Sequence, residues 1–290
     1  MGNDKKTRVL VLGVSGMLGN AVFRVFARSD GYAAIGSARS GGVLRLLPAD
    51  LRAQVVCGVD VENADSLMQL FAVARPDVVI NCIGLIKQLA HADDPLAALP
   101  INALLPHRLA RLCDVAAARL IHMSTDCVFS GSRGMYTEQD VSDAQDLYGR
   151  SKYLGEVDYP HAVTLRTSII GHELNSANGL VGWFLAQQVP VKGYGRAIFS
   201  GLPTVELAHV MRDYVVPNAD LRGLYHVSAE PINKFELLKL VGQAYGKDTT
   251  VTRDDSLVID RSLDSSRFRE ITGYKPPAWP ELVRRMHAFS

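Results

Sequence analysis

The sequence lacks several features that would direct its function elsewhere. Its 31 basic and 30 acidic residues leave a formal charge of +1, whereas a surface that binds nucleic-acid phosphates usually carries a marked basic excess. The most apolar stretch of the second half, residues 179–191, is interrupted by two glutamines and a proline and is too short to span a bilayer. We therefore predict that neither nucleic acid nor a membrane is a partner.

Only four cysteines are present, and no two of them form a CxxC pair. Cys57, Cys82 and Cys113 lie in apolar stretches, which favours a place in the core over a disulfide or a metal site. The polar N-terminus leads into an apolar run of strand length, shorter than the apolar region of a signal peptide. Histidines and acids show no ligand spacing, so no metal is expected. The sequence indicates a cytoplasmic protein.

Strand and helix patterns alternate through the first half of the chain. Short apolar runs predict strands at 8–13, 31–37, 54–60, 76–84, 119–125 and 162–171. Apolar residues at helical spacing predict helices at 16–28, 63–74, 101–116 and 147–156. This alternation predicts an α/β fold, a Rossmann-type doubly wound parallel sheet. After Gly171 the rhythm breaks, which predicts a smaller C-terminal lobe for the substrate. The predicted bounds are 1–170 and 197–226 for the dinucleotide domain, and 171–196 and 227–290 for the smaller lobe.

Three glycines, Gly13, Gly16 and Gly19, lie between the first predicted strand and the first helix. A pyrophosphate needs close approach to the backbone and the free N–H groups of a helix N-terminus. At the first strand-turn-helix of an alternating chain, this spacing predicts a dinucleotide site. The other cofactor-binding residues that we assign to this site are Ser15, Met17, Leu18, Val61, Cys82, Ile83 and Gly84.

The end of the second predicted strand carries Ser37 and Arg39 where an acidic residue would hold the ribose of NADH. A guanidinium suits a 2′-phosphate, so the sequence favours NADP(H), with NAD(H) as the alternative. Asp60 follows the third strand, where its carboxylate would either bind the adenine amino group or cap the next helix.

Thr125 and Asp126 end the fifth predicted strand, and Tyr148 and Lys152 share one face of a helix 23 residues later. Ligands of doubly wound sheets bind beyond the carboxyl ends of the strands. We therefore expect Thr125 and Tyr148 to bracket a carbonyl oxygen, with Tyr148 as the proton donor. We expect the Lys152 ammonium to lower the pKa of the phenol and to hold the nicotinamide ribose.

These residues resemble the extended short-chain dehydrogenase/reductases, and more narrowly the family of dTDP-4-dehydrorhamnose reductase. The similar segments include STDCVFSG, LYGRSKYLGE, LRTSIIG and SLDSSRFREITGYKPPAW. The resemblance implies an oxidoreductase that transfers hydride from NAD(P)H to the 4-keto carbon of a nucleotide-linked 6-deoxysugar, in carbohydrate biosynthesis. It implies that Thr125, Tyr148 and Lys152 are catalytic, that Arg166 and Thr167 contact the substrate, and that the smaller lobe binds the sugar nucleotide.

The sequence departs from this family at two aromatic positions and in one segment. Cys127 and Ile169 stand where the family has aromatic residues beside the sugar. The segment after the fourth strand carries Lys87, Gln88 and His91 as candidate substrate contacts, with a surface helix as the alternative for His91. The redox residues are retained, so these changes concern which keto-sugar is bound.

Three other functions share the fold. An epimerase would use the same catalytic residues with tightly retained NAD, and Arg39 favours released NADPH instead. A non-catalytic regulatory relative, such as the β subunit of methionine adenosyltransferase, would be favoured had Tyr148 or Lys152 been lost. A 4,6-dehydratase is disfavoured because Cys127 stands where it has its second acid. The sequence is compatible with both a monomer and a homo-oligomer.

Overall fold

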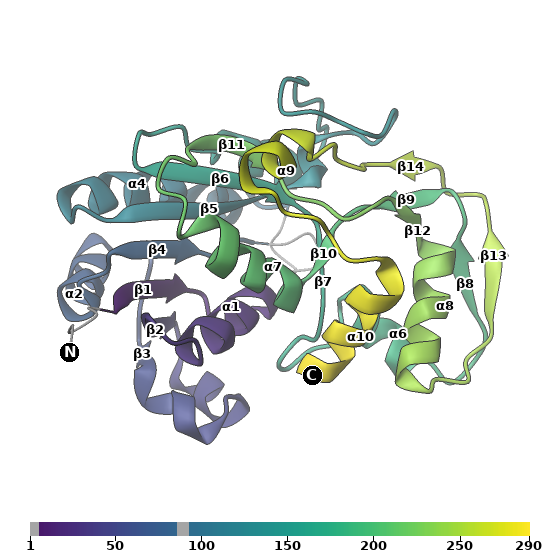
Figure 1. Cartoon of the computed structure of the whole chain (residues 1–290), viewed down its shortest axis with the longest axis horizontal. Helices are drawn as coiled ribbons and strands as arrows, with labels where there is room; N and C mark the ends of the chain where they lie inside the picture. The colour runs from purple at the N-terminus through teal and green to yellow at the C-terminus, as the bar shows by residue number, and fades with distance from the viewer. Residues whose placement is uncertain (1–5, 86–92) are drawn as a thin grey trace.

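The computed structural model describes residues 6–85 and 93–290. Its centre is a parallel sheet of seven strands in the order β11-β6-β5-β4-β1-β2-β3, seen at the left of Figure 1. The bounds of these strands are Thr7–Leu12 (β1), Tyr32–Ala38 (β2), Val55–Cys57 (β3), Val78–Asn81 (β4), Arg119–Thr125 (β5), Ala162–Thr167 (β6) and Gly223–His226 (β11). The predicted Rossmann-type doubly wound sheet is confirmed. The seventh strand, β11, was not among the predicted strands.

Helices cover both faces of this sheet. The α-helices of the described residues, in both lobes, are Met17–Ala27 (α1), Ala64–Ala74 (α2), Pro95–Ala98 (α3), Leu105–Val115 (α4), Leu147–Leu154 (α5), Leu180–Ala186 (α6), Thr204–Val210 (α7), Lys234–Tyr245 (α8), Ser266–Thr272 (α9) and Trp279–Phe289 (α10). The predicted helix at 101–116 is divided, because a π-helical turn, Leu99–Leu104, precedes α4. The predicted start of α2 is confirmed, since the Asn63 side chain accepts the Ser66 N–H.

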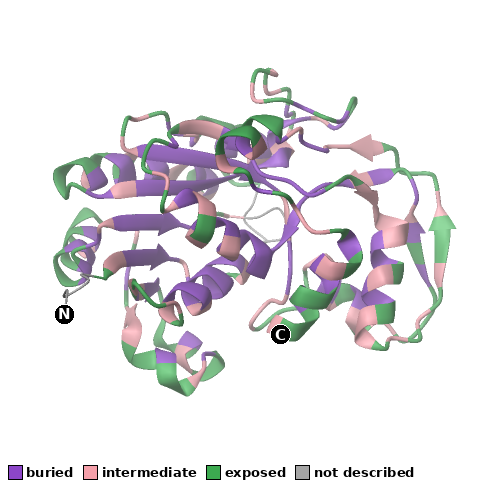
Figure 2. Cartoon of the chain, viewed as in Figure 1, coloured by how far each residue is buried: buried purple, intermediate pink, exposed green. Residues whose placement is uncertain are grey.

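Alternation along β1 explains why the sheet is covered on two sides. Val9 and Val11 belong to a core cluster that includes residues of α1 and α7, whereas Leu10 and Leu12 belong to a second cluster with residues of α2 and α4. Successive side chains of a strand point to opposite faces, so a continuously apolar strand needs a layer on each. Figure 2 shows the central strands β1, β4, β5 and β6 as largely buried and the outer surfaces of α2 and α4 as largely exposed.

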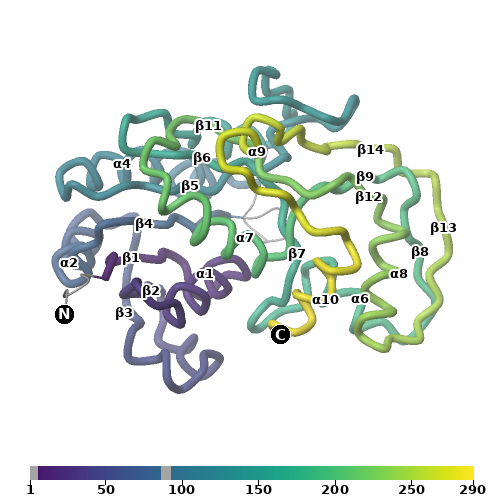
Figure 3. The backbone as a smooth tube through the Cα atoms, in the orientation of Figure 1, coloured from purple at the N-terminus to yellow at the C-terminus, as the bar shows by residue number. Residues whose placement is uncertain are grey.

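A smaller lobe at the right of Figure 1 is built on three short sheets. Their strands are Ile169–Ile170 (β7) with Leu202–Pro203 (β10), Val191–Tyr194 (β8) with Val251–Asp254 (β13), and Ala197–Phe199 (β9) between Ile232–Asn233 (β12) and Ile259–Asp260 (β14). The chain returns from this lobe through α9 to α10, which packs against α7 and α8 (Figure 3). The predicted domain bounds stay a prediction.

No helix among residues 6–85 and 93–290 is both long enough and apolar enough to cross a membrane. All four cysteines are free thiols.

Candidate active site

The glycine turn joins β1 to α1 with its backbone folded closely on itself. Gly13 has a φ of +87°, and its N–H and that of Val14 donate to the Ser37 carbonyl. A Cβ on Gly19 would lie 2.1 Å from the Gly13 carbonyl oxygen, so only glycine permits this approach. The N-cap, Gly16, has no side chain to cap the first N–H groups of α1. These N–H groups and the close backbone fit a dinucleotide pyrophosphate.

The end of β2 places the predicted ribose contacts beside that turn. Ser37 is buried, and its carbonyl holds the glycine turn. Arg39 is exposed one residue beyond the strand, and Ser40 caps a 3₁₀ helix at Gly41–Leu46. An exposed guanidinium here suits a 2′-phosphate, but no contact in the structure tests that role.

Asp60 makes a local turn beyond β3. Its Oδ1 accepts the Glu62 N–H at 3.0 Å, and its own N–H donates to Ser66 Oγ. Asp60 is not the cap of the next helix, because Asn63 caps α2; its contact with the adenine amino group stays a prediction. The neighbouring Val61 packs against the second core cluster.

The loop after β4 brings predicted cofactor residues close to Lys152 of α5. A Cβ on Gly84 would lie 3.9 Å from Lys152 Nζ, and the Ile83 N–H donates to Asn81 Oδ1. Burial raises the pKa of the Cys82 thiol to about 12, so this cysteine is a neutral neighbour of Lys152. The predicted contacts Lys87, Gln88 and His91 lie outside the described residues.

Helix α5 carries Tyr148 and Lys152 against the end of β5. The Asp146 carboxylate caps the helix by accepting the Gly149 N–H at 2.8 Å. A Cβ on Gly149 would lie 2.3 Å from the Cys127 carbonyl oxygen, so glycine lets the helix reach the loop that follows β5. Lys152 is buried, and its Nζ donates to the Met123 carbonyl at 2.6 Å.

The environment of Tyr148 corrects one prediction. Burial raises the pKa of the phenol, and the nearby Cys127 and Asp126 raise it further, while a hydrogen bond with Thr125 opposes them. The Lys152 ammonium is directed to the Met123 carbonyl. In the chain by itself the net shift of the phenol pKa is upward, opposite to the expected lowering. The phenol is neutral at ordinary pH, the form that donates a proton.

Thr125 and Asp126 lie where the sequence predicts them, at the carboxyl end of β5. Thr125 Oγ1 donates to Asp126 Oδ1 at 3.2 Å and accepts the Cys127 N–H at 3.1 Å. Burial raises the pKa of the Asp126 carboxyl, and the Arg261 guanidinium opposes that rise. The turn therefore presents a threonine hydroxyl beside a poorly solvated acid.

Arg166 is bound inside the protein by neighbouring side chains. Its side chain is only 3% exposed, and its Nε and Nη2 each donate to the Glu156 carboxylate at 2.6 Å. Nη1 bonds to His226 Nε2 at 3.3 Å. Each of its three nitrogens thus has a partner inside the protein, and its predicted contact with the substrate stays a prediction.

The other predicted substrate contacts lie near the start of the smaller lobe. Thr167 is buried opposite Thr125 in the β5–β6 register, and its hydroxyl donates to the Ser168 carbonyl. Ile169 is half-buried on β7. Their contact with a sugar stays a prediction.

Three residues of this site were not identified from the sequence. Asn102, in the π-helical turn, accepts the Leu85 N–H at 2.9 Å and donates to Ser151 Oγ at 3.2 Å, which fixes α5 from behind. Glu156 and Arg261 are the other two. An asparagine inside an apolar helical pattern was the available signal for the first, whereas Arg261 lies more than 100 residues from its neighbours in the site.

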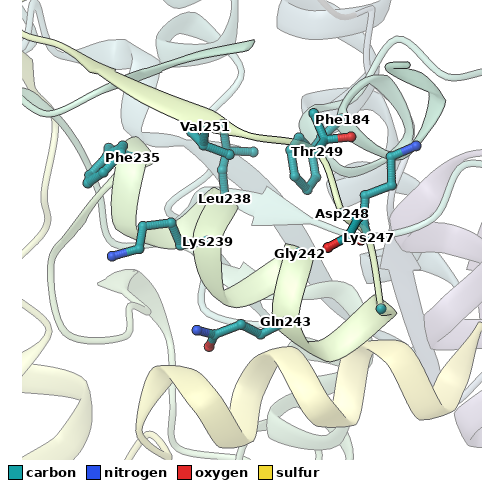
Figure 4. A pocket seen from close by; sticks show the side chains of 11 residues that line it. Phe184, Phe235, Leu238, Lys239, Gly242, Gln243, Lys247, Asp248, Thr249 and Val251 are labelled. Carbon is teal, nitrogen blue, oxygen red and sulfur yellow. The ribbon is translucent and has the colours of Figure 1, made fainter. Parts of the chain in front are cut away.

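One cavity lies away from these residues. About 550 Å³ in volume, it is bounded by α8, Phe184 of α6 and the segment from Lys247 to Val251 (Figure 4). None of its lining residues is a predicted site residue. The described residues also contain no group of three or more histidines, cysteines and acids that could hold a metal ion.

Comparisons with known proteins agree with this arrangement. The rat β subunit of methionine adenosyltransferase 2 is 32% identical over 97% of this chain and 90% of its own length. A probable low-salt glycan biosynthesis reductase of Haloferax volcanii is 32% identical over 60% of this chain and 57% of its own. The crystal structure of dTDP-4-dehydrorhamnose reductase from Bacillus anthracis in complex with NADP superposes with a TM-score of 0.81 at 22% identity, covering all of both chains. The family model described as RmlD substrate binding domain matches residues 7–288, and the chain belongs to that family.

Proposed function

We propose that this protein is an NADPH-dependent reductase of the 4-keto group of a nucleotide-linked 6-deoxyhexose. The carrying observation is the position of Tyr148, hydrogen-bonded to Thr125 and one helical turn from the buried Lys152, at the carboxyl end of a parallel sheet whose first turn fits a pyrophosphate. Similarity to a reductase with NADP bound supports the cofactor.

The cofactor, when bound, supplies a hydride to the carbonyl carbon of the sugar. Thr125 orients the carbonyl oxygen by a hydrogen bond from its hydroxyl. Tyr148 gives its phenolic proton to that oxygen as negative charge develops on it, so that C=O becomes CH–OH. Lys152 holds the nicotinamide ribose.

The smaller lobe binds the nucleotide portion in this proposal. Arg261, which follows β14, supplies a cation to the wall of the site formed by Asp126 and Cys127. A diphosphate is a natural partner for a guanidinium. Cys127 and Ile169, in place of aromatic residues, shape the sugar pocket. A cytoplasmic location fits four free thiols.

The test is NADPH consumption with freshly generated dTDP- and UDP-linked 4-keto-6-deoxyhexoses, with NADH in parallel. Turnover with one of them establishes the reaction and identifies the nucleotide. A sugar that changes configuration with no net NADPH loss would indicate an epimerase instead.

The alternative with support is a non-catalytic regulatory subunit, because the rat relative is named as the β subunit of methionine adenosyltransferase 2. Tight NADPH binding without turnover of any keto-sugar, together with a stable complex with a methionine adenosyltransferase, would favour it.

A further inference from the structure

Lys152, in the last turn of α5, and Glu156, two residues beyond the helix, contact two consecutive residues of β5. Lys152 Nζ donates to the Met123 carbonyl at 2.6 Å, and Glu156 Oε1 accepts the Ser124 hydroxyl at 2.6 Å. The next residue of the strand is Thr125, the hydroxyl of the proposed active site. The Lys152 ammonium and the Glu156 carboxylate thus bind α5 and the residues after it to β5, immediately before Thr125.

Glu156 is also one half of a buried ion pair. Arg166 binds both of its oxygens at 2.6 Å, and the two side chains are 10% and 3% exposed. Beyond Arg166, His226 Nδ1 lies 2.9 Å from the Tyr136 carbonyl, so it carries the hydrogen and leaves Nε2 to accept from Arg166. Burial lowers the pKa of His226 to about 4, so that ring is neutral. The Glu156 carboxylate is therefore paired with Arg166, and the Lys152 ammonium is held at the neighbouring residue of β5.

The groups around Lys152 have opposing effects on its charge. Burial lowers the pKa of Lys152 to about 8, and the Glu156 carboxylate is the largest influence against that fall, followed by Cys82 of the loop after β4. His122 of β5 is fully buried with its pKa well below the usual value, so it is neutral. Tyr148 is neutral as well, because its pKa is raised. Glu156 is therefore the anion that compensates the buried ammonium.

We infer that Glu156 is a positioning residue for the cofactor site: it keeps the Lys152 ammonium charged and held against β5, and Arg166 moderates this effect by sharing the same carboxylate. The inference rests on the NADP(H) site of the proposed function. It does not require that any particular sugar be reduced, because Lys152 meets the cofactor before the substrate.

The experiment measures the dissociation constant of NADPH by fluorescence between pH 7 and pH 10. In the wild-type protein, affinity falls as the pH rises through about 8, because Lys152 loses its proton. Glu156→Gln moves this midpoint down by about one pH unit, which weakens binding about fivefold at pH 8 and much less at pH 7. Arg166→Met moves the midpoint up, since the carboxylate then serves Lys152 alone.

Ser124→Ala is the matched control, because it removes a hydrogen bond to Glu156 without removing a charge. The pH midpoint of NADPH binding for Ser124→Ala stays at the wild-type value. A purely structural role of these hydrogen bonds would move the midpoints of Glu156→Gln, Arg166→Met and Ser124→Ala alike, or move none of them. If Glu156→Gln does not fold, the same substitution is made together with Arg166→Met, which removes both charges of the pair. The double variant then has a lower midpoint than Arg166→Met alone.

Equal midpoints in Glu156→Gln and the wild type, or midpoints that move in the same direction in Glu156→Gln and Arg166→Met, would overturn the inference. If the pH midpoints of NADPH binding move as predicted but no sugar is turned over, the positioning role of Glu156 is supported and the reductase function is refuted. A wild-type protein that does not bind NADPH would overturn both.

Discussion

Arg261 of the smaller lobe lies against Cys127 of the loop that follows β5, with its Nη1 3.8 Å from the sulfur. Its Nε donates to the Phe129 carbonyl at 2.8 Å, so the guanidinium is held across the loop that begins at Asp126. This contact joins the lobe proposed to bind the nucleotide to the end of β5, which carries Thr125. The Arg261 guanidinium is therefore a fixed cation beside the end of β5, although Arg261 is far from the glycine turn along the sequence.

Arg261→Met is expected to raise the KM for the sugar nucleotide about tenfold to a hundredfold, because a hydrogen bond to a charged group contributes about 1.5–3 kcal/mol. The dissociation constant of NADPH should stay within about twofold. Steady-state kinetics and fluorescence titration measure the two values. Arg253→Met is the control, since Arg253 is an exposed partner of Asp255 in the same lobe. An unchanged KM for Arg261→Met would contradict the substrate role.

Tyr148→Phe should lower the turnover number by about a hundredfold to ten-thousandfold, the usual worth of a general acid. NADPH should bind nearly as well as to the wild type, because Lys152 and the glycine turn are unchanged. Single-turnover NADPH oxidation checks the rate. Tyr153→Phe removes an exposed phenol from the same helix and should have no effect. A Tyr148→Phe enzyme with the wild-type rate would refute the proton-donor role.

Arg39→Ala should weaken NADPH binding by about tenfold or more and leave NADH binding within about twofold, because only NADPH has a 2′-phosphate for the guanidinium. The two dissociation constants, measured side by side, test this. Arg45→Ala is the control, as Arg45 is exposed in the 3₁₀ helix that follows. Equal losses for the two cofactors would remove the 2′-phosphate assignment.

Lys152→Met should be at least as stable as the wild type at pH 7, although it loses function. The folded-state pKa of Lys152 is about 8, below the ordinary lysine value of 10.5. Between these two pH values the unfolded chain binds more protons, so wild-type stability rises with pH, and below about pH 8 the full cost of the buried ammonium, about 3 kcal/mol, is present. The advantage of Lys152→Met should therefore shrink from pH 8 to pH 10.5. Urea unfolding at several pH values measures it, and a difference independent of pH would contradict the burial of a charge.

Much of the fold could be predicted because its signals are local. The apolar runs of β1, β4, β5 and β6 and the cap at Asn63 each depend on a few adjacent residues. The seventh strand, β11, was missed because four residues, Gly223–His226, carry too little pattern to distinguish a strand from a loop. It becomes a strand by pairing with β6, about 60 residues earlier in the chain.

The candidate site divides in the same way. The spacing of Tyr148 and Lys152 and the proximity of Thr125 follow from a helix repeat and from strand ends that meet at one edge of a parallel sheet. The role of Arg166 did not follow, because a strand pattern says that its side chain faces one side of the sheet but not that Glu156 meets it there.

The sequence by itself determined the α/β alternation, the glycine turn and the helix that presents Tyr148 and Lys152, since each is written in residues that are neighbours along the chain. Only the tertiary structure decided the charges. Burial sets the pKa of Tyr148 and Lys152, and the groups that oppose burial, Thr125 for the first and Glu156 for the second, act through contacts made by packing. Desolvation depends on everything that surrounds a group, so no local pattern encodes it.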